Sequence, residues 1–138
     1  RLVGSEMCIR DSYHIWGKDG APDLQLVPAA VFTVPEVAMV GHTEETASAA
    51  GLEYSIRKAF YRANGKSLSM GESEGIVKIL VGPDGLLLGA HVLGAHAADL
   101  IHELALAIHT KMGVERIQSL IHAHPSLSEI LHDAVMNA

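Results

Sequence analysis

The sequence has little cysteine, few aromatic residues and no excess of positive charge. Its 138 residues include one cysteine, so an internal disulfide and a cysteine-rich zinc site are both excluded. Ten Lys and Arg against 16 Asp and Glu give a formal net charge of −6, and no basic stripe of the kind that binds nucleic acid is visible. A membrane span needs about 18 consecutive apolar residues, and no apolar run in the sequence approaches that length. No secretory signal pattern is found either. We therefore expect a soluble, cytoplasmic protein that binds neither nucleic acid nor membrane.

Three nucleotide- or metal-binding motifs are also missing. Gly65-Lys66-Ser67 is similar to the end of a phosphate-binding loop, but the position that requires the earlier glycine holds Phe60. No G-x-G-x-x-G fingerprint occurs, and His102-Glu103 is not followed by the second histidine of H-E-x-x-H. We expect no dinucleotide site built by this sequence alone.

Length and composition indicate one globular domain, because 49% of the residues are apolar and 19% are charged. Residues 1–12 have no helical or strand periodicity and include Cys8. We interpret them as a leader that is either a frayed end or not native, and we place the single domain at residues 13–138. Nothing in the sequence near Cys8 indicates a lowered thiol pKa, so it is not expected to be a nucleophile.

Strand patterns come first along the sequence. The strongest is a hairpin in which Gly75–Val81 and Leu86–Leu93 are joined by the turn Gly82–Gly85. Other strands are expected at Pro28–Thr33, at Val37–Gly41 (a second strand, or a continuation of the first past a bulge) and at Leu52–Tyr61.

Helix patterns dominate the second half. Thr43 is a plausible N-cap for a helix that ends at Gly51, and Asn64–Ser67 is expected to be a loop. Further helices are expected at Ala97–Met112 with Gly113 as C-cap, at Val114–Leu120 and at Ser126–Met136. Together these patterns predict an α+β fold with a mostly antiparallel sheet flanked by helices.

Apolar positions on two of these helices are candidates for the core or for a two-fold contact between identical chains. They are Leu100, Ile101, Ile130, Leu131 and Val135. His102 and Glu103 lie beside the first group and are assigned to the surface or to that interface. The sequence therefore allows a homodimer with an isologous contact.

Nine histidines are a high number for this length. His122 and His124 would share a face of a strand, and His102 and His109 share a helix face. No local spacing fixes a third ligand, so we predict no metal site and keep metal binding as an alternative.

His124-Pro125-Ser126-Leu127-Ser128-Glu129 is the most suggestive segment. Histidine is the usual acid/base near neutral pH, and a carboxylate that holds its tautomer makes it a better base. A helix that folds back after Pro125 would bring Glu129 to the imidazole, and such an X-Pro bond is a candidate for cis. A purely structural interpretation competes, because Ser126-x-x-Glu129 is also a capping box.

The same segment resembles the H-x-H-P-T-x-x-E signature of the pyridine nucleotide-disulfide oxidoreductases. Two more stretches agree in the same order: Val31 to Gly41 with Thr43-Glu44-Glu45 is similar to the family's entry to its last domain, and Gly75 to Leu80 with Gly89 to Gly94 is similar to its hairpin. The residues of the signature are most similar to those of dihydrolipoamide dehydrogenases. Two departures are Ser126, where the signature has Thr, and His42, where the family often has an apolar residue.

The resemblance implies a C-terminal dimerisation domain of a flavoenzyme whose FAD and NAD domains and redox-active disulfide lie upstream. It implies that His124 acts as acid/base in the partner subunit's site, that Glu129 orients it, and that the backbone of His124 and Pro125 lies near the partner's FAD. A homodimer and a 2-oxoacid dehydrogenase complex are the implied partners. The domain alone would hold no cofactor and would be inactive.

Two alternatives to this function remain. One is the same domain in a glutathione or mercuric reductase, although the missing C-terminal cysteine pair argues against the latter. The other is a stand-alone dimerisation module without chemistry.

Overall fold

The computed structural model describes residues 11–17 and 26–137. Residues 11–15 form a short helical stretch. Cys8 and most of the leader expected at residues 1–12 lie outside the described residues. In the described part, no helix combines the length and the apolar character that crossing a membrane requires.

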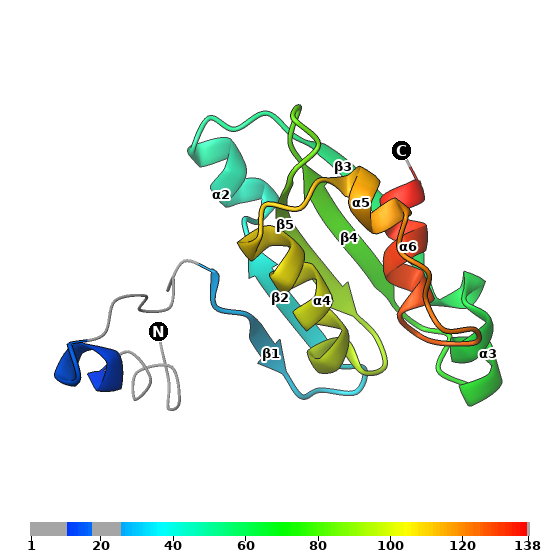
Figure 1. Cartoon of the computed structure of the whole chain (residues 1–138). Coiled ribbons are helices and arrows are strands. Elements are labelled where there is room, and N and C mark those ends of the chain that lie inside the picture. Colours follow the sequence, from blue (N-terminus) through cyan, green and yellow to red (C-terminus); the bar gives the residue numbers. More distant parts are fainter. Residues whose placement is uncertain (1–10, 18–25, 138) are drawn as a thin grey trace.

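The centre of the fold is a five-stranded antiparallel sheet with the order β1-β2-β5-β4-β3 (Figure 1). Its strands are β1 (Ala29–Val31), β2 (Val37–Gly41), β3 (Ser55–Phe60), β4 (Ile76–Val81) and β5 (Leu87–Leu93). The β4–β5 hairpin lies in the middle, so the strongest sequence signal forms the core of the sheet.

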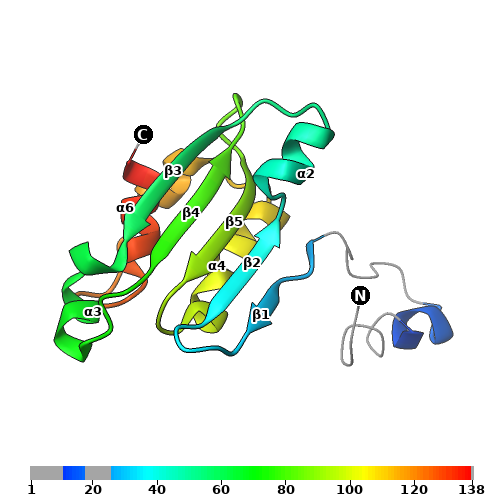
Figure 2. The ribbon, with the colours of Figure 1, turned by 180° about the vertical axis from the view of Figure 1, so that it is seen from behind.

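Further helical elements surround the sheet. Within residues 26–137 they are α2 (Glu44–Ala49), η2 (Tyr61–Ala63), α3 (Gly65–Met70), α4 (Ala97–His109), α5 (Val114–Gln118) and α6 (Glu129–Met136). The three C-terminal helices cover one face, whereas α2 and α3 lie toward opposite ends of the sheet (Figures 1 and 2). Helix α4 packs on β2 and β5, and α6 packs on β3 and β4. The two long helices thus cover different halves of the sheet.

The hydrophobic core lies between this sheet face and the helices. Alternate residues of the strands point into it, as the period of two requires, and meet the apolar faces of α4 and α6. Ile79 and Leu104 are among its fully buried members, and Ile130 and Leu131 close it from α6. Each buried aliphatic side chain contributes on the order of 2 kcal/mol to folding.

The α+β class and the antiparallel sheet are confirmed. The hairpin forms as expected, and Val37–Gly41 is a second strand paired with the first rather than its continuation. Thr43 caps α2 through its hydroxyl, which accepts the amide N–H of Thr46 at 3.1 Å, and Gly51 follows with a φ of 70°.

Two local expectations about the helices were wrong. Asn64–Ser67 is not a loop but the start of α3, because the Asn64 side chain accepts the Ser67 amide N–H at 2.9 Å and caps the helix. Helix α4 ends before Gly113, which is instead the N-cap of α5. Lys111, with a φ of 51°, takes the left-handed conformation there, and the amide of Met112 bonds to the carbonyl of Ala107 at 2.8 Å.

The strand β3 runs from Ser55 to Phe60 rather than from Leu52 to Tyr61, and it ends where the chain turns at Tyr61. That ring is fully buried, and its hydroxyl donates to the carbonyl of Ala95 at 2.9 Å. A Cβ at Gly94, which has a φ of 149°, would lie 2.4 Å from the ring. The Tyr61 carbonyl accepts the hydroxyl of Ser67, so this turn also holds the start of α3.

Of the two roles open to the apolar helix positions, core and two-fold contact, the structure shows the core. Leu100, Ile101, Ile130, Leu131 and Val135 are at most 7% exposed and belong to the core of this chain. Helical periodicity identifies an apolar face but does not say whether the face meets the same chain or another one. Different apolar side chains are exposed nearby: Leu106, Leu120 and Ile121.

Candidate functional site

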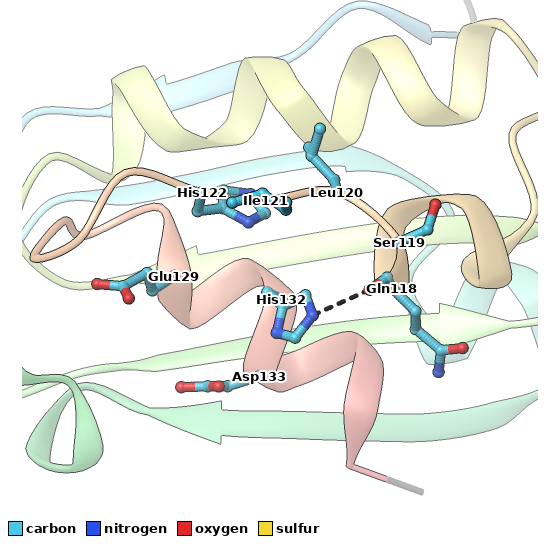
Figure 3. Close-up of a pocket in the computed structure, with 8 residues that line it drawn as sticks. All are labelled: Gln118, Ser119, Leu120, Ile121, His122, Glu129, His132 and Asp133. Carbon is cyan, nitrogen blue, oxygen red and sulfur yellow. Dashed lines mark hydrogen bonds between the residues drawn. The ribbon is translucent and has the colours of Figure 1, made fainter.

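The segment 119–128 links α5 to α6 and carries the histidines singled out from the sequence. It has no regular secondary structure and runs between α4 and α6 in the direction of α3 (Figures 1 and 3). The His124–Pro125 peptide bond is cis. The segment therefore lies over the boundary between the two halves of the sheet.

His124 and Glu129 come together as the sequence predicted. Nδ1 of the imidazole lies 2.8 Å from Oε1 of the carboxylate. An ionised carboxylate only accepts hydrogen bonds, so Nδ1 carries the hydrogen and donates it. The His124 side chain is 81% exposed, and its Nε2 has no hydrogen-bond partner among the residues that the structure describes. The ring thus presents a free acceptor nitrogen to its surroundings.

The capping box is only half formed. Oε2 of Glu129 accepts the amide N–H of Ser126 at 2.8 Å, but the Ser126 hydroxyl is buried without a partner within the described part of the chain. Helix α6 begins after Ser128, and its first amides bond in tight three-residue turns to Leu127 and Ser128. Glu129 therefore takes part in both the cap and the pair with His124, because one carboxylate oxygen accepts from the backbone and the other from the imidazole.

These contacts lower the pKa of Glu129. The hydrogen bond from the Ser126 amide is the larger cause, and the hydrogen bond from His124 adds to it. The carboxylate is therefore ionised near neutral pH, which is the state that keeps the hydrogen on Nδ1 of His124.

A second histidine–carboxylate pair lies next to the first. Nε2 of His122 is 2.8 Å from Oε1 of Glu103, which comes from α4. The His122 side chain is 7% exposed, and Glu103 is 32% exposed. This pair could not be predicted from local spacing, because 19 positions separate the two residues. The signal available in the sequence was that Glu103 follows the buried stripe of α4 and His122 precedes His124 in H-x-H-P.

A surface hollow of about 340 Å³ opens beside these pairs (Figure 3). Its lining runs from the end of α5 to α6: Gln118, Ser119, Leu120, Ile121, His122, Glu129, His132 and Asp133. The rings of His122 and His132 meet edge to face at a centroid distance of 5.9 Å. His132 also lies 3.2 Å from the carbonyl of Gln118, which ties α6 to α5.

The other histidines do not form a metal-binding cluster with these. Over residues 11–17 and 26–137, no group of three His, Cys, Asp or Glu side chains is arranged to hold a metal ion. The sites that the structure does form are histidine–carboxylate pairs, which hold and orient protons.

Comparisons with known proteins agree with the fold and the signature. The matching family model is the dimerisation domain of the pyridine nucleotide-disulphide oxidoreductases, over residues 27–135. Dihydrolipoyl dehydrogenase 2 of Haloarcula marismortui is 46% identical over 123 residues, which are 88% of this chain and 26% of that protein. Dihydrolipoyl dehydrogenase of Bacillus subtilis is 44% identical over 121 residues, covering 87% of this chain and 26% of that one.

Among solved structures, LpdA from Mycobacterium tuberculosis superposes with a TM-score of 0.83 at 27% sequence identity. The match covers 91% of this chain and 28% of that one. The chain therefore spans about a quarter of the length of the relatives it matches.

Proposed function

Because the chain belongs to the pyridine nucleotide-disulphide oxidoreductases and matches their dimerisation domain, we propose that it supplies the acid/base pair His124–Glu129 to a dihydrolipoyl dehydrogenase. The observation that carries the proposal is the 2.8 Å contact on Nδ1, which leaves Nε2 exposed as the free acceptor. Both named relatives are dihydrolipoyl dehydrogenases, which supports that choice of substrate over glutathione disulfide or mercuric ion.

The imidazole would accept the S–H proton of a dithiol substrate at Nε2. The thiolate that results is the nucleophile in thiol–disulfide exchange, and its sulfur attacks one sulfur of a disulfide while the other sulfur leaves as a thiolate. Glu129 holds the receiving tautomer before the transfer and faces the imidazolium after it.

In the complete enzyme, the cofactors would be bound mainly by domains that this chain does not contain. FAD and NAD would supply the acceptor for the two electrons that the dithiol gives up. In the part of the chain described, no backbone N–H or C=O of residues 121–125 is hydrogen-bonded, so His124 and Pro125 offer free polar groups to a neighbour such as a partner subunit's FAD. The sequence has no dinucleotide fingerprint, and these residues fit an edge contributed to a cofactor pocket rather than a pocket of their own.

We further propose that residues 13–138 are one domain and that a homodimer forms beside the candidate site. Leu106 on α4 and Leu120 and Ile121 in the segment 119–128 are exposed apolar side chains, and Ile121 is 93% exposed. An isologous contact through these residues would bring each His124 to the other subunit. A 2-oxoacid dehydrogenase complex would be the larger assembly that supplies the dithiol.

A chimera tests the acid/base role. This chain replaces the aligned segment of the Bacillus subtilis dihydrolipoyl dehydrogenase, and His124→Gln is compared with His109→Gln, an exposed histidine at the end of α4. We expect His124→Gln to lower kcat for dihydrolipoamide oxidation by about 100- to 10,000-fold, the usual contribution of acid/base catalysis.

His109→Gln should leave kcat within about twofold, as expected of a surface substitution. Reduction of an artificial acceptor by NADH, which needs no dithiol, should be unchanged in both. Equal activity of the two variants toward dihydrolipoamide would refute the acid/base role.

A further inference from the structure

The segment that carries His124 is held by side chains rather than by its own backbone. Within the described residues, the amides and carbonyls of residues 121–125 make no hydrogen bonds to the chain. A free loop of this kind would place an exposed imidazole in many positions. Something other than the backbone must therefore fix where His124 lies.

Side-chain hydrogen bonds hold the segment on both sides of His124. Two residues before it, His122 bonds to Glu103 of α4 at 2.8 Å. Two residues after it, Nδ2 of the buried Asn64 donates to the carbonyl of Ser126 at 3.0 Å. These anchors come from different regions of the fold, so the segment is tied to α4 on one side and to the start of α3 on the other.

The anchor on α4 is held by burial, by a hydrogen bond and by a ring contact. The His122 ring is buried, donates to the Glu103 carboxylate and meets the His132 ring of α6 edge to face. Burial and a charge-assisted hydrogen bond restrict both torsions of the ring. Because only Ala123 separates His122 from His124, a fixed His122 leaves His124 little freedom to move.

We propose that Glu103 and His122 are positioning residues that hold the His124 segment in register with Glu129. The expected effect on kcat rests on the proposed function. The placement of His124 by these residues concerns this chain alone. Neither residue needs to touch the substrate. Their contribution is to keep Nδ1 of His124 on the carboxylate of Glu129, so that Nε2 stays the accepting nitrogen.

The test compares two substitutions of Glu103, one that keeps a hydrogen-bonding group and one that removes it. Glu103→Gln keeps a hydrogen-bonding group for His122, whereas Glu103→Met keeps the length and the helix propensity but removes the hydrogen bond. Glu115→Met on α5 is the matched control, because Glu115 is exposed and near the segment in sequence. The ring nitrogen resonances of His124 are recorded by NMR in the 138-residue chain, and kcat and KM are measured in the chimera.

We expect Glu103→Met to move the two ring nitrogen resonances of His124 toward each other, as the Nδ1–H tautomer loses its preference. In the chimera it should lower kcat about tenfold with KM within about twofold, the effect of a misplaced group rather than of weaker binding. Glu103→Gln and Glu115→Met should match the parent in both measurements.

Two results would overturn the inference: unchanged His124 resonances in Glu103→Met, or equal changes in Glu103→Met and Glu115→Met. If Glu103→Met does not fold, His122→Asn replaces it, since the shorter amide cannot reach Glu103 from the same backbone position. A positive NMR result together with full activity of His124→Gln would sustain the positioning role and refute the proposed function instead.

Discussion

His122 and His124 stand two positions apart, and each has a carboxylate 2.8 Å from one ring nitrogen. His122 uses Nε2, the tip of the ring, and is buried against α4. His124 uses Nδ1, next to its own backbone, and leaves its tip in the open. The same pair of residue types is therefore arranged in two ways, which differ in the nitrogen that is bonded and in the exposure of the ring.

The difference shows what makes a histidine chemically available. A carboxylate on Nδ1 prepares Nε2 to accept a proton, whereas a carboxylate on Nε2 occupies the atom that reaches farthest from the chain. Distance alone does not distinguish the two pairs. Exposure and the identity of the bonded nitrogen do, and variants of the two carboxylates should therefore behave differently.

Glu129→Gln should give the largest contrast when it is compared with Glu103→Gln. The substituted amide can keep the Ser126 amide N–H on its one oxygen, but it then turns its NH₂ to His124 and favours hydrogen on Nε2. We expect a loss of about 100-fold or more in kcat of the chimera, within the range of acid/base contributions. The melting temperature should change by less than about 3 °C, as for other substitutions that keep their contacts.

Glu103→Gln should keep both activity and melting temperature. Parallel losses of activity and melting temperature in Glu129→Gln would instead favour a role limited to capping α6, and the contrast between the two pairs would disappear.

Asn64→Asp should have the next largest effect and extends the comparison to the other anchor. Aspartate keeps the cap on α3 but cannot donate to the Ser126 carbonyl, and it places a charge against that carbonyl in a buried position. We expect a loss of about 2 kcal/mol in the free energy of unfolding, measured by denaturant titration of the chain.

Asn137→Asp is the matched control, because its Nδ2 makes a similar bond of 3.1 Å to the carbonyl of Lys58 on the surface. It should cost about 0.5 kcal/mol or less. Equal costs at the two positions would mean that burial at Asn64 contributes nothing.

The pH dependence of stability should show the smallest effect. The pKa of Glu129 lies below its ordinary value of 4.5, so its contacts stabilise the folded chain above that pH. The contribution is lost as the pH falls through the lowered pKa, because the protonated carboxyl no longer accepts both hydrogen bonds. The difference in melting temperature between the parent chain and Glu129→Gln should be constant near neutral pH and shift below pH 4.5. A difference that stays constant down to about pH 3 would contradict the lowered pKa.

Local patterns predicted most of the fold and half of the site. The β4–β5 hairpin and the Thr43 cap depend on neighbours in sequence, so their residues were sufficient to predict them. His124 and Glu129 lie five positions apart and are joined by a turn, which made their contact predictable as well.

The remainder depends on contacts between distant segments. Glu103 meets His122 because the segment 119–128 runs beside α4, and helical periodicity could not place that segment. The same limit explains why the sequence could not decide between the core and an interface for Leu100 and Ile130. Asn64 was missed for a different reason: Asn followed by Gly is typical of a turn, and its capping role became visible only with the helix after it.

The packing of α6 on β3 has a consequence for the order of events during synthesis. Arg57 reaches the carbonyl of Val135, and Asn137 reaches that of Lys58, so a strand made early is completed by a helix made about 80 residues later. The same helix brings Glu129 to His124. A nascent chain stopped before α6 lacks both the last part of its core and the proposed acid/base pair, and folding and chemical competence would arrive in one step.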